Sequence, residues 1–184
     1  MLRWPIADAV ELRIPEERHA QDLFDVIERN RERLERWMHW AHHTHSKDDV
    51  LAFIRSARGD FRKPDSLHLL IVCRGKISGG CSLILINEKS GEIGYWIDSA
   101  EEGKGIVTAC CRELIRYGFE ETGLNRIQIR CAVGNKRSAS IPRRLAFVYE
   151  GTLRETIPCG SGLLDAEVYS LLKREYQALK PAAG

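Results

Sequence analysis

The alternation of apolar and polar positions predicts a first strand at residues 10–14, where valine, leucine and isoleucine alternate with charged residues. A proline and acidic residues then open a segment whose apolar positions recur every three or four residues, which indicates an amphipathic helix from residue 15 to about residue 34. A second helix is expected from Ser46 to Ala57, because a serine followed by two aspartates favours a helix start.

The middle of the chain has the pattern of an antiparallel meander. Three runs rich in aliphatic and β-branched residues, Ser66–Cys73, Ile77–Leu85 and Glu92–Asp98, are separated by short glycine-containing segments. A helix is expected next, over about Gly103–Thr122, with Gly123 at its C-terminal end.

The last third of the chain adds strands at Ile127–Val133, Tyr149–Thr156 and Glu167–Leu172, with a short helix at Ser138–Leu145. No linker or repeat divides the chain, so we expect one domain over residues 1–184. This order of elements predicts an α/β fold of the mixed α+β kind. Its sheet is expected to be mixed, mostly antiparallel and twisted, with about seven strands and helices on both faces.

Composition narrows the classes of function. Hydrophobic residues make up 43% of the chain and charged residues 29%, and the formal net charge is +2. No overall charge therefore favours nucleic acid or a membrane surface as a partner. There is no apolar run of about 18 residues to form a transmembrane helix, and the start lacks a signal-peptide core. The six cysteines have no CxxC spacing, which predicts buried, reduced thiols and a cytoplasmic location.

The segment Gly103–Thr108 carries the clearest chemistry, because two glycines lie between a predicted strand and a predicted helix. Glycine lets a backbone adopt positive φ and approach a ligand. The first N–H groups of a helix have no internal partner and bind phosphate groups well. The spacing fits neither a Walker loop nor a dinucleotide-binding Rossmann turn. A tight strand-to-helix turn explains this segment, taken alone, equally well.

This segment resembles the coenzyme A signature of the GNAT N-acetyltransferase superfamily, Q/R-x-x-G-x-G/A. Gly105 matches the fixed glycine, whereas Glu102 and Val107 depart from the usual residues. The resemblance continues, in order, through segments typical of the RimJ/RimL-like ribosomal-protein branch. These segments are Asn30–Trp40, Leu124–Ser138, Arg144–Gly151 and Asp165–Leu172.

The resemblance implies a GNAT fold with splayed central strands and acetyl-CoA as cosubstrate, held mainly by backbone groups. In this family the strand ending near Ile97 lies along the pantetheine arm, and Asn135 hydrogen-bonds one of its amides. The implied coenzyme-binding residues are Ile97, Asp98, Ser99, Glu102, Gly103, Lys104, Gly105, Ile106, Val107, Thr108, Asn135, Arg137 and Ser138.

The same resemblance implies direct attack of an amine on the thioester, without a metal. Ser138 is then the acid that protonates the departing thiolate, although a serine at this position also fits a helix cap. The resemblance does not identify the general base, because Ile157 stands where related ribosomal enzymes carry a glutamate. Glu92 is the preferred candidate. The others are Glu155, Asp165 and Glu167.

Trp37, Trp40 and Tyr169 are the candidate residues for acceptor binding. His39 and His43 have the spacing of two metal ligands on a helix, but no third ligand follows at a matching distance, so no metal is expected. The acceptor is expected to be a protein N-terminus, with a polyamine or antibiotic amine as the alternative. A coenzyme A-binding domain without catalysis is the third possibility. The branch often forms dimers, so a homo-oligomer is expected.

Overall fold

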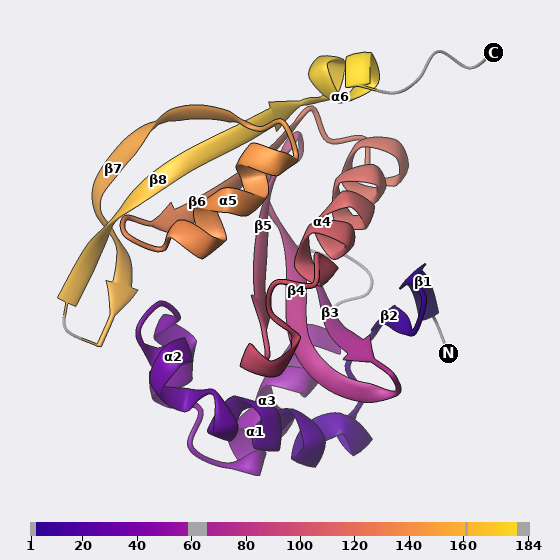
Figure 1. Cartoon of the computed structure of the whole chain (residues 1–184), viewed down its shortest axis with the longest axis vertical. Helices are drawn as coiled ribbons and strands as arrows, with labels where there is room; N and C mark the ends of the chain where they lie inside the picture. Colours follow the sequence, from indigo (N-terminus) through magenta and orange to yellow (C-terminus); the bar gives the residue numbers. More distant parts are fainter. Residues whose placement is uncertain (1–2, 59–65, 161, 180–184) are drawn as a thin grey trace.

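The computed structural model describes residues 3–58, 66–160 and 162–179. In this part of the chain one eight-stranded sheet has the order β1-β2-β3-β4-β5-β6-β8-β7 (Figure 1). Its strands are β1 (Arg3–Ala7), β2 (Val10–Arg13), β3 (Ser66–Cys73), β4 (Lys76–Asn87), β5 (Ser90–Ile97), β6 (Arg126–Ala132), β7 (Val148–Cys159) and β8 (Gly162–Leu172).

Helices cover both faces of this sheet, as predicted. Residues of α4 and α5 pack in one hydrophobic cluster against one face, and residues of α1, α2 and α3 pack in a second cluster against the other. The α-helices are α1 (Ala20–Arg29), α2 (Arg31–Glu35), α3 (Lys47–Arg58), α4 (Ile106–Arg116), α5 (Lys136–Arg144) and α6 (Lys173–Leu179). Three short 3-10 helices, η1 (Glu17–His19), η2 (His39–His43) and η3 (Ser99–Glu101), and a π-helical turn, η4 (Tyr117–Glu121), complete the list.

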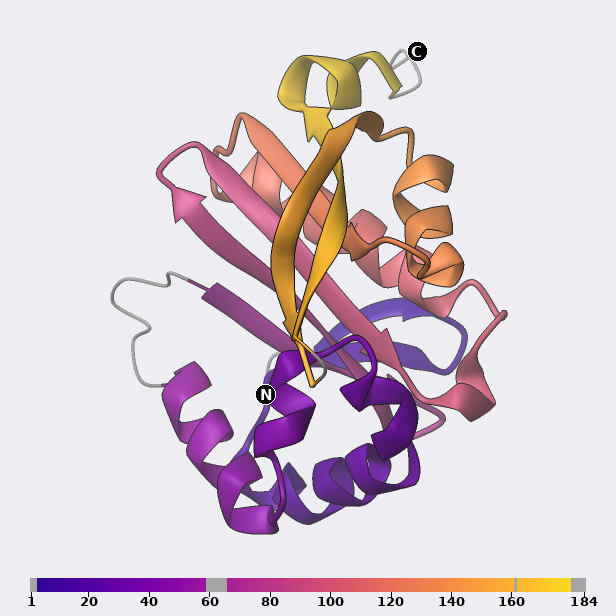
Figure 2. The ribbon, with the colours of Figure 1, turned by 90° about the vertical axis from the view of Figure 1, so that its left-hand side faces the viewer.

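The sheet consists of two wings. Strands β1 to β5 form an antiparallel meander, and β6, β8 and β7 form a second antiparallel group. The wings meet in a parallel pairing of β5 with β6. In Figure 1 the β7–β8 arm curves away from β3, β4 and β5, and in Figure 2 its tip lies over the N-terminal helices.

The structure confirms the mixed, mostly antiparallel sheet and corrects several details. The eighth strand, β1, was missed because Pro5 lies inside it. Proline is tolerated there because β1 is an edge strand, where a missing N–H breaks no ladder. Helix α6 was also missed. Helix α4 begins three residues later than expected, because Gly103 and Gly105 have φ of +76° and +75°, which a right-handed helix excludes.

Five of the six cysteines are buried in the core, in agreement with the sequence. They are Cys73, Cys81, Cys110, Cys111 and Cys131. None of the helices in the described ranges has the length and apolar character needed to cross a bilayer.

Candidate functional site

The central strands part at the middle of the sheet. Strand β5 is paired with β6 only from Ser90 to Glu92, although both strands continue for several residues. Beyond Glu92, β5 stays bound to β4 and β6 stays bound to β8. Asp98 N–H donates to Ser78 O on the β4 side, and successive peptide groups of a strand point to opposite edges. The peptide groups of Tyr95 and Ile97 therefore face the gap.

A cavity of about 590 Å³ occupies this gap. Its floor is the sheet face of β3, β4 and β5, and one wall is the segment around η2. Residues 156–158 of β7 form the opposite wall, and the tip of the arm rests on η2, where a Cβ built on Gly160 would lie 2.4 Å from the ring of His42. The arm therefore closes the side of the cavity where the two wings separate.

The Gly103–Thr108 turn presents a row of open amides. Ala109 N–H is the first to find an acceptor in the new helix, at Gly105 O. In the described ranges none of the N–H groups of residues 103–108 donates a hydrogen bond. Both glycines have left-handed φ, and a Cβ on either would meet open space. This arrangement, at the positive end of α4, suits a diphosphate.

The strand end before this turn is fixed by the junction of α1 and α2. Arg29 Nε donates to Asp98 Oδ2 at 2.8 Å, and Asn30 Nδ2 donates to Asp98 Oδ1 at 3.1 Å. Ser99 N–H donates in turn to Asn30 Oδ1 at 3.0 Å. Burial alone would raise the pKa of Asp98, but the hydrogen bonds from Arg29, Asn30 and the Ala100 amide bring it below its usual value. The side chain of Asp98 thus anchors the loop from behind.

The charged residues predicted at the coenzyme site are already engaged. Glu102 forms ion pairs with Arg33 of α2 and Arg137 of α5. Arg33 also donates to Ile97 O, a carbonyl on the gap side of β5. Lys104 Nζ turns back to Ala100 O at 2.7 Å and Glu101 Oε2 at 2.9 Å. Glu102 therefore carries no uncompensated charge beside the amides.

At the start of α5, Asn135 caps the helix by accepting the Ser138 N–H at 3.2 Å. Ser138 Oγ lies 3.2 Å from Tyr95 Oη and 3.3 Å from Cys131 Sγ. The Tyr95 hydroxyl donates to the carbonyl oxygen of Ser138 at 3.0 Å. Burial raises the pKa of Tyr95 and that of Cys131, so both groups stay protonated at neutral pH. The predicted serine thus combines a cap with a place in the cavity wall.

Glu92 lies where β5 and β6 part, and its carboxylate lines the cavity. Its Oε2 accepts hydrogen bonds from Gln128 Nε2 and Arg130 Nε, both at 2.8 Å. The other candidate bases do not line the cavity: Asp165 accepts the Glu155 N–H, and Glu167 accepts the Tyr169 hydroxyl. Ile157 does line it. Among the described lining residues Glu92 is the one carboxylate.

Aromatic residues dominate the end of the cavity near η2. Trp37 and Trp40 both line it, and the ring of Trp40 lies 5.8 Å from that of Trp96. Trp96 lies directly over Gly80, where a Cβ would stand 2.8 Å from its indole nitrogen. His68 also lines the cavity, edge-on to Phe53 with ring centroids 5.4 Å apart, and burial lowers the pKa of His68.

The remaining residues singled out by the sequence are Tyr169 and the pair His39 and His43. Tyr169 is buried in the core and its hydroxyl accepts from Arg143, outside the cavity lining. The ring nitrogens of His39 and His43 approach to 3.2 Å, but among the described residues no group of three ligating side chains gathers around them.

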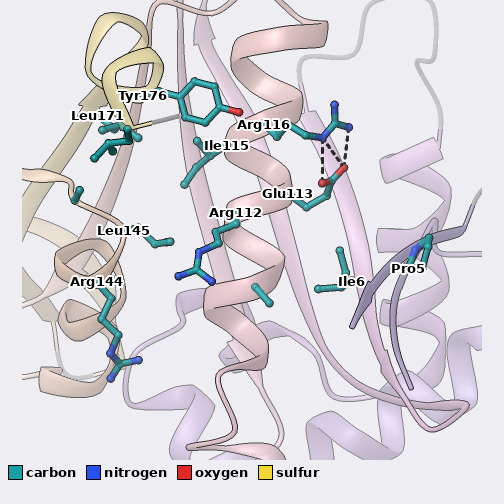
Figure 3. A pocket seen from close by; sticks show the side chains of 13 residues that line it. Pro5, Ile6, Arg112, Glu113, Ile115, Arg116, Arg144, Leu145, Leu171 and Tyr176 are labelled. Atoms are coloured by element: carbon teal, nitrogen blue, oxygen red, sulfur yellow. Dashed lines mark hydrogen bonds and ion pairs between the residues drawn. The ribbon is translucent and has the colours of Figure 1, made fainter. Parts of the chain in front are cut away.

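A second groove of about 590 Å³ follows the exposed side of α4, one turn beyond the Gly103–Thr108 amides (Figure 3). Arg112 of α4 and Arg144 of α5 line it, and Arg144 donates to Ser140 Oγ at 3.1 Å. Leu145, Leu171 and Tyr176 add an apolar wall. The groove therefore offers positive charge beside an apolar surface.

Sequence reasoning missed the roles of Tyr95, Cys131, Trp96 and Asn30. Tyr95 and Trp96 follow apolar neighbours in a strand, which favours core packing. One signal was present, since adjacent Gly79 and Gly80 inside a strand often mark the close approach of another group. Here Gly80 makes room for the Trp96 indole.

Comparisons with known proteins agree with this geometry. Residues 9–148 match the family described as the acetyltransferase (GNAT) domain. YdaF of Bacillus subtilis (strain 168), provisionally assigned as a ribosomal N-acetyltransferase, is 35% identical over 98% of this chain and 100% of its own. The ribosomal-protein-serine acetyltransferase of Escherichia coli (strain K12) is 25% identical over 90% and 93%. The structure of the microcin C7 self-immunity acetyltransferase MccE with acetyl-CoA and AMP has a TM-score of 0.85 at 29% identity, and the match covers 91% of this chain and 94% of MccE.

Proposed function

The chain belongs to the GNAT acetyltransferase family, and from this premise we propose that it acetylates the N-terminal amine of a protein, with a ribosomal protein as the acceptor class. That family membership makes it an N-acetyltransferase that uses acetyl-CoA. The names of YdaF and of the E. coli relative support the ribosomal acceptor. The predicted homo-oligomer stays a prediction.

The observation that carries this proposal is the continuity of the gap between β5 and β6. Open amides of residues 103–108 lie at one end, the Ser138 hydroxyl lies on the wall, and the aromatic cavity lies at the other end. An extended thioester fits such a path, with its diphosphate at the amides and its pantetheine arm beside the peptide groups of Tyr95 and Ile97. The Asn135 amide nitrogen, which donates to no described residue, faces the same helix start and suits a pantetheine carbonyl.

Acetyl transfer requires one proton to leave the amine nitrogen and one proton to reach the thioester sulfur. The amine nitrogen attacks the thioester carbon and loses one proton, and the sulfur takes the electron pair of the broken C–S bond and gains one proton. Ser138 supplies the proton to the sulfur. Glu92 is the candidate group that takes the proton leaving the amine, directly or through water, and this proton then returns through water to restore Ser138. Its bonds with Gln128 and Arg130 hold it at the point where the strands part.

The residues that line the cavity favour one class of acceptor amine over the other. A polyamine carries several positive charges, and such a ligand calls for several carboxylates. Glu92 is the one carboxylate among the described lining residues, and Arg130 neutralises it. A single amine next to an apolar group suits Trp37 and Trp40 better. The second candidate is a small amine that carries a planar group, which the Trp40–Trp96 pair favours.

Mass spectrometry of acetyl transfer tests the proposal. Purified protein with acetyl-CoA is expected to add one acetyl group to ribosomal-protein N-terminal peptides, and not to the same peptides with a formylated N-terminus. Spermidine is expected to remain unmodified. Ser138→Ala is expected to lower kcat about 100-fold with little change in affinity for coenzyme A. Binding of coenzyme A without transfer to any amine would instead identify a binding domain.

A further inference from the structure

Tyr95, Ser138 and Cys131 meet on the wall of the gap, although they come from β5, α5 and β6. The sequence predicts Cys131 as a buried thiol and assigns no role to Tyr95, and the reaction proposed above uses only Ser138. The contacts join them into one chain of hydrogen bonds. The count of protons shows which of these contacts Tyr95 donates and which it accepts.

The Tyr95 hydroxyl has one proton, and it points to the carbonyl oxygen of Ser138 at 3.0 Å. A carbonyl oxygen only accepts, so this proton cannot point the other way. Tyr95 Oη must therefore accept from Ser138 Oγ, which lies 3.2 Å away. Ser138 Oγ is also placed to donate to Cys131 Sγ at 3.3 Å, so its single proton has two acceptors within reach. The Tyr95 hydroxyl and the Cys131 thiol lie 4.0 Å apart.

These contacts fix both the backbone and the side chain of Ser138. The backbone of Ser138 is fixed by the Asn135 cap, and its Oγ is fixed between Tyr95 and Cys131. Catalytic groups that are held within a fraction of an ångström retain their rate advantage, whereas a free serine rotates among three rotamers.

From this geometry we propose that Tyr95 is a positioning residue that holds the Ser138 hydroxyl at the thioester sulfur. The inference rests on the role of Ser138 in the proposed function. When the C–S bond breaks, the Ser138 proton moves to the sulfur, and the Tyr95 hydroxyl turns from the carbonyl to donate to the Ser138 oxygen. Tyr95 keeps its own proton throughout, because burial disfavours its phenolate.

Steady-state kinetics of Tyr95→Phe, Ser138→Ala and the double variant test this role. Tyr95→Phe keeps the ring and removes the hydroxyl, so we expect kcat to fall about tenfold while KM for acetyl-CoA changes less than about twofold. The double variant is expected to match Ser138→Ala alone, because Tyr95 acts through Ser138. The pH profile of kcat is expected to keep the positions of its limbs. Tyr117→Phe is the control, since it removes a half-buried hydroxyl at the far end of α4.

Other outcomes would overturn the inference in distinguishable ways. An equal loss in both backgrounds would show that Tyr95 acts independently, and a shifted alkaline limb would make Tyr95 the acid itself. A lowered melting temperature of Tyr95→Phe with unchanged kcat would show that Tyr95 has a purely structural role. If Ser138→Ala keeps full activity, the acid role and this inference fail together. Transfer by the unmodified protein tests the proposed function separately.

Discussion

In the proposed function, the coenzyme end and the acceptor end of the gap recognise their ligands by different means. At the coenzyme end the proposed recognising groups are backbone amides of one short segment, residues 103–108, and side chains hold the preceding residues Asp98 and Ser99 from behind. At the acceptor end the proposed recognising groups are side chains from β3, β5, β6, β7 and the η2 region. A contiguous motif therefore records the first site, whereas the second exists only after folding.

This contrast also explains which departures from the family pattern are tolerated. Glu102 replaces the usual Gln or Arg, yet the amides that receive the diphosphate are unchanged by a neighbouring side chain. The two arginines on Glu102 neutralise its charge. At the acceptor end the family resemblance implies that Ile157 stands where related enzymes carry a glutamate. A site built from side chains would then change its chemistry through a single replacement.

The largest effect is expected at the backbone end, from Gly105→Glu. The substitution places a side chain on a left-handed residue and a negative charge among the open amides, so we expect affinity for coenzyme A to fall at least about 100-fold, or roughly 2.7 kcal/mol. Isothermal titration with coenzyme A measures this change.

Gly123→Glu is the matched control for that variant. Gly123 has a φ of +71° and open surroundings like those of Gly105, but it ends η4 far from the cavity. The Gly123→Glu substitution imposes the same backbone strain as Gly105→Glu and is expected to leave coenzyme affinity unchanged. Similar losses in both variants would mean that strain, and not the amide row, explains the effect.

An intermediate effect is expected at the side-chain end, from Trp40→Ala. Trp40 is 37% exposed and contributes one ring of the Trp40–Trp96 pair, so its removal takes away stacking area that an acceptor covers. KM for an acceptor peptide is expected to rise about tenfold, or roughly 1.4 kcal/mol, while affinity for coenzyme A stays the same.

Tyr149→Ala is the control for Trp40, because its ring is also exposed but lies outside the cavity lining. Steady-state kinetics with a peptide series and calorimetry with coenzyme A separate the two ends of the gap. A loss of coenzyme affinity in Trp40→Ala would contradict the separation on which the comparison depends.

The difference between the two ends of the gap also explains which features could be predicted from the sequence and which could not. The amphipathic period of α3, the meander and the GKG turn are local patterns, and each was predicted within a few residues. The single helix predicted over residues 15–34 is divided at Asn30 into α1 and α2. Strand β1 was missed because a strand tolerates a proline such as Pro5 only at the edge of the sheet, and the position of a strand in the sheet is not a local pattern. The Tyr95–Ser138–Cys131 contact was missed because its three residues are brought together only when β5 and β6 part. Tyr169 follows a family motif, yet packing placed its hydroxyl on Arg143 and Glu167.

The smallest effect is expected where the two ends are linked, at Glu102. Its carboxylate pairs with Arg137, at the coenzyme end, and with Arg33, on the helix that leads into Trp37. Glu102→Gln removes a negative charge beside the diphosphate and releases Arg137 to bind it. Exposed ion pairs contribute under about 1 kcal/mol, so we expect coenzyme affinity to rise about threefold at low salt. Added salt screens such charges and is expected to reduce the gain.

A double-mutant cycle identifies the partner responsible. If Arg137 moves from Glu102 to the diphosphate, the gain from Glu102→Gln shrinks in an Arg137→Gln background. Glu28→Gln, which removes one of the two carboxylates that pair with Arg31, changes the net charge equally and is expected to leave affinity unchanged. A gain of the same size in both backgrounds would assign the effect to overall charge. A weaker affinity in Glu102→Gln would mean that the carboxylate holds the mouth of the gap in its binding shape, and the acceptor end would then depend on the coenzyme end through Arg33.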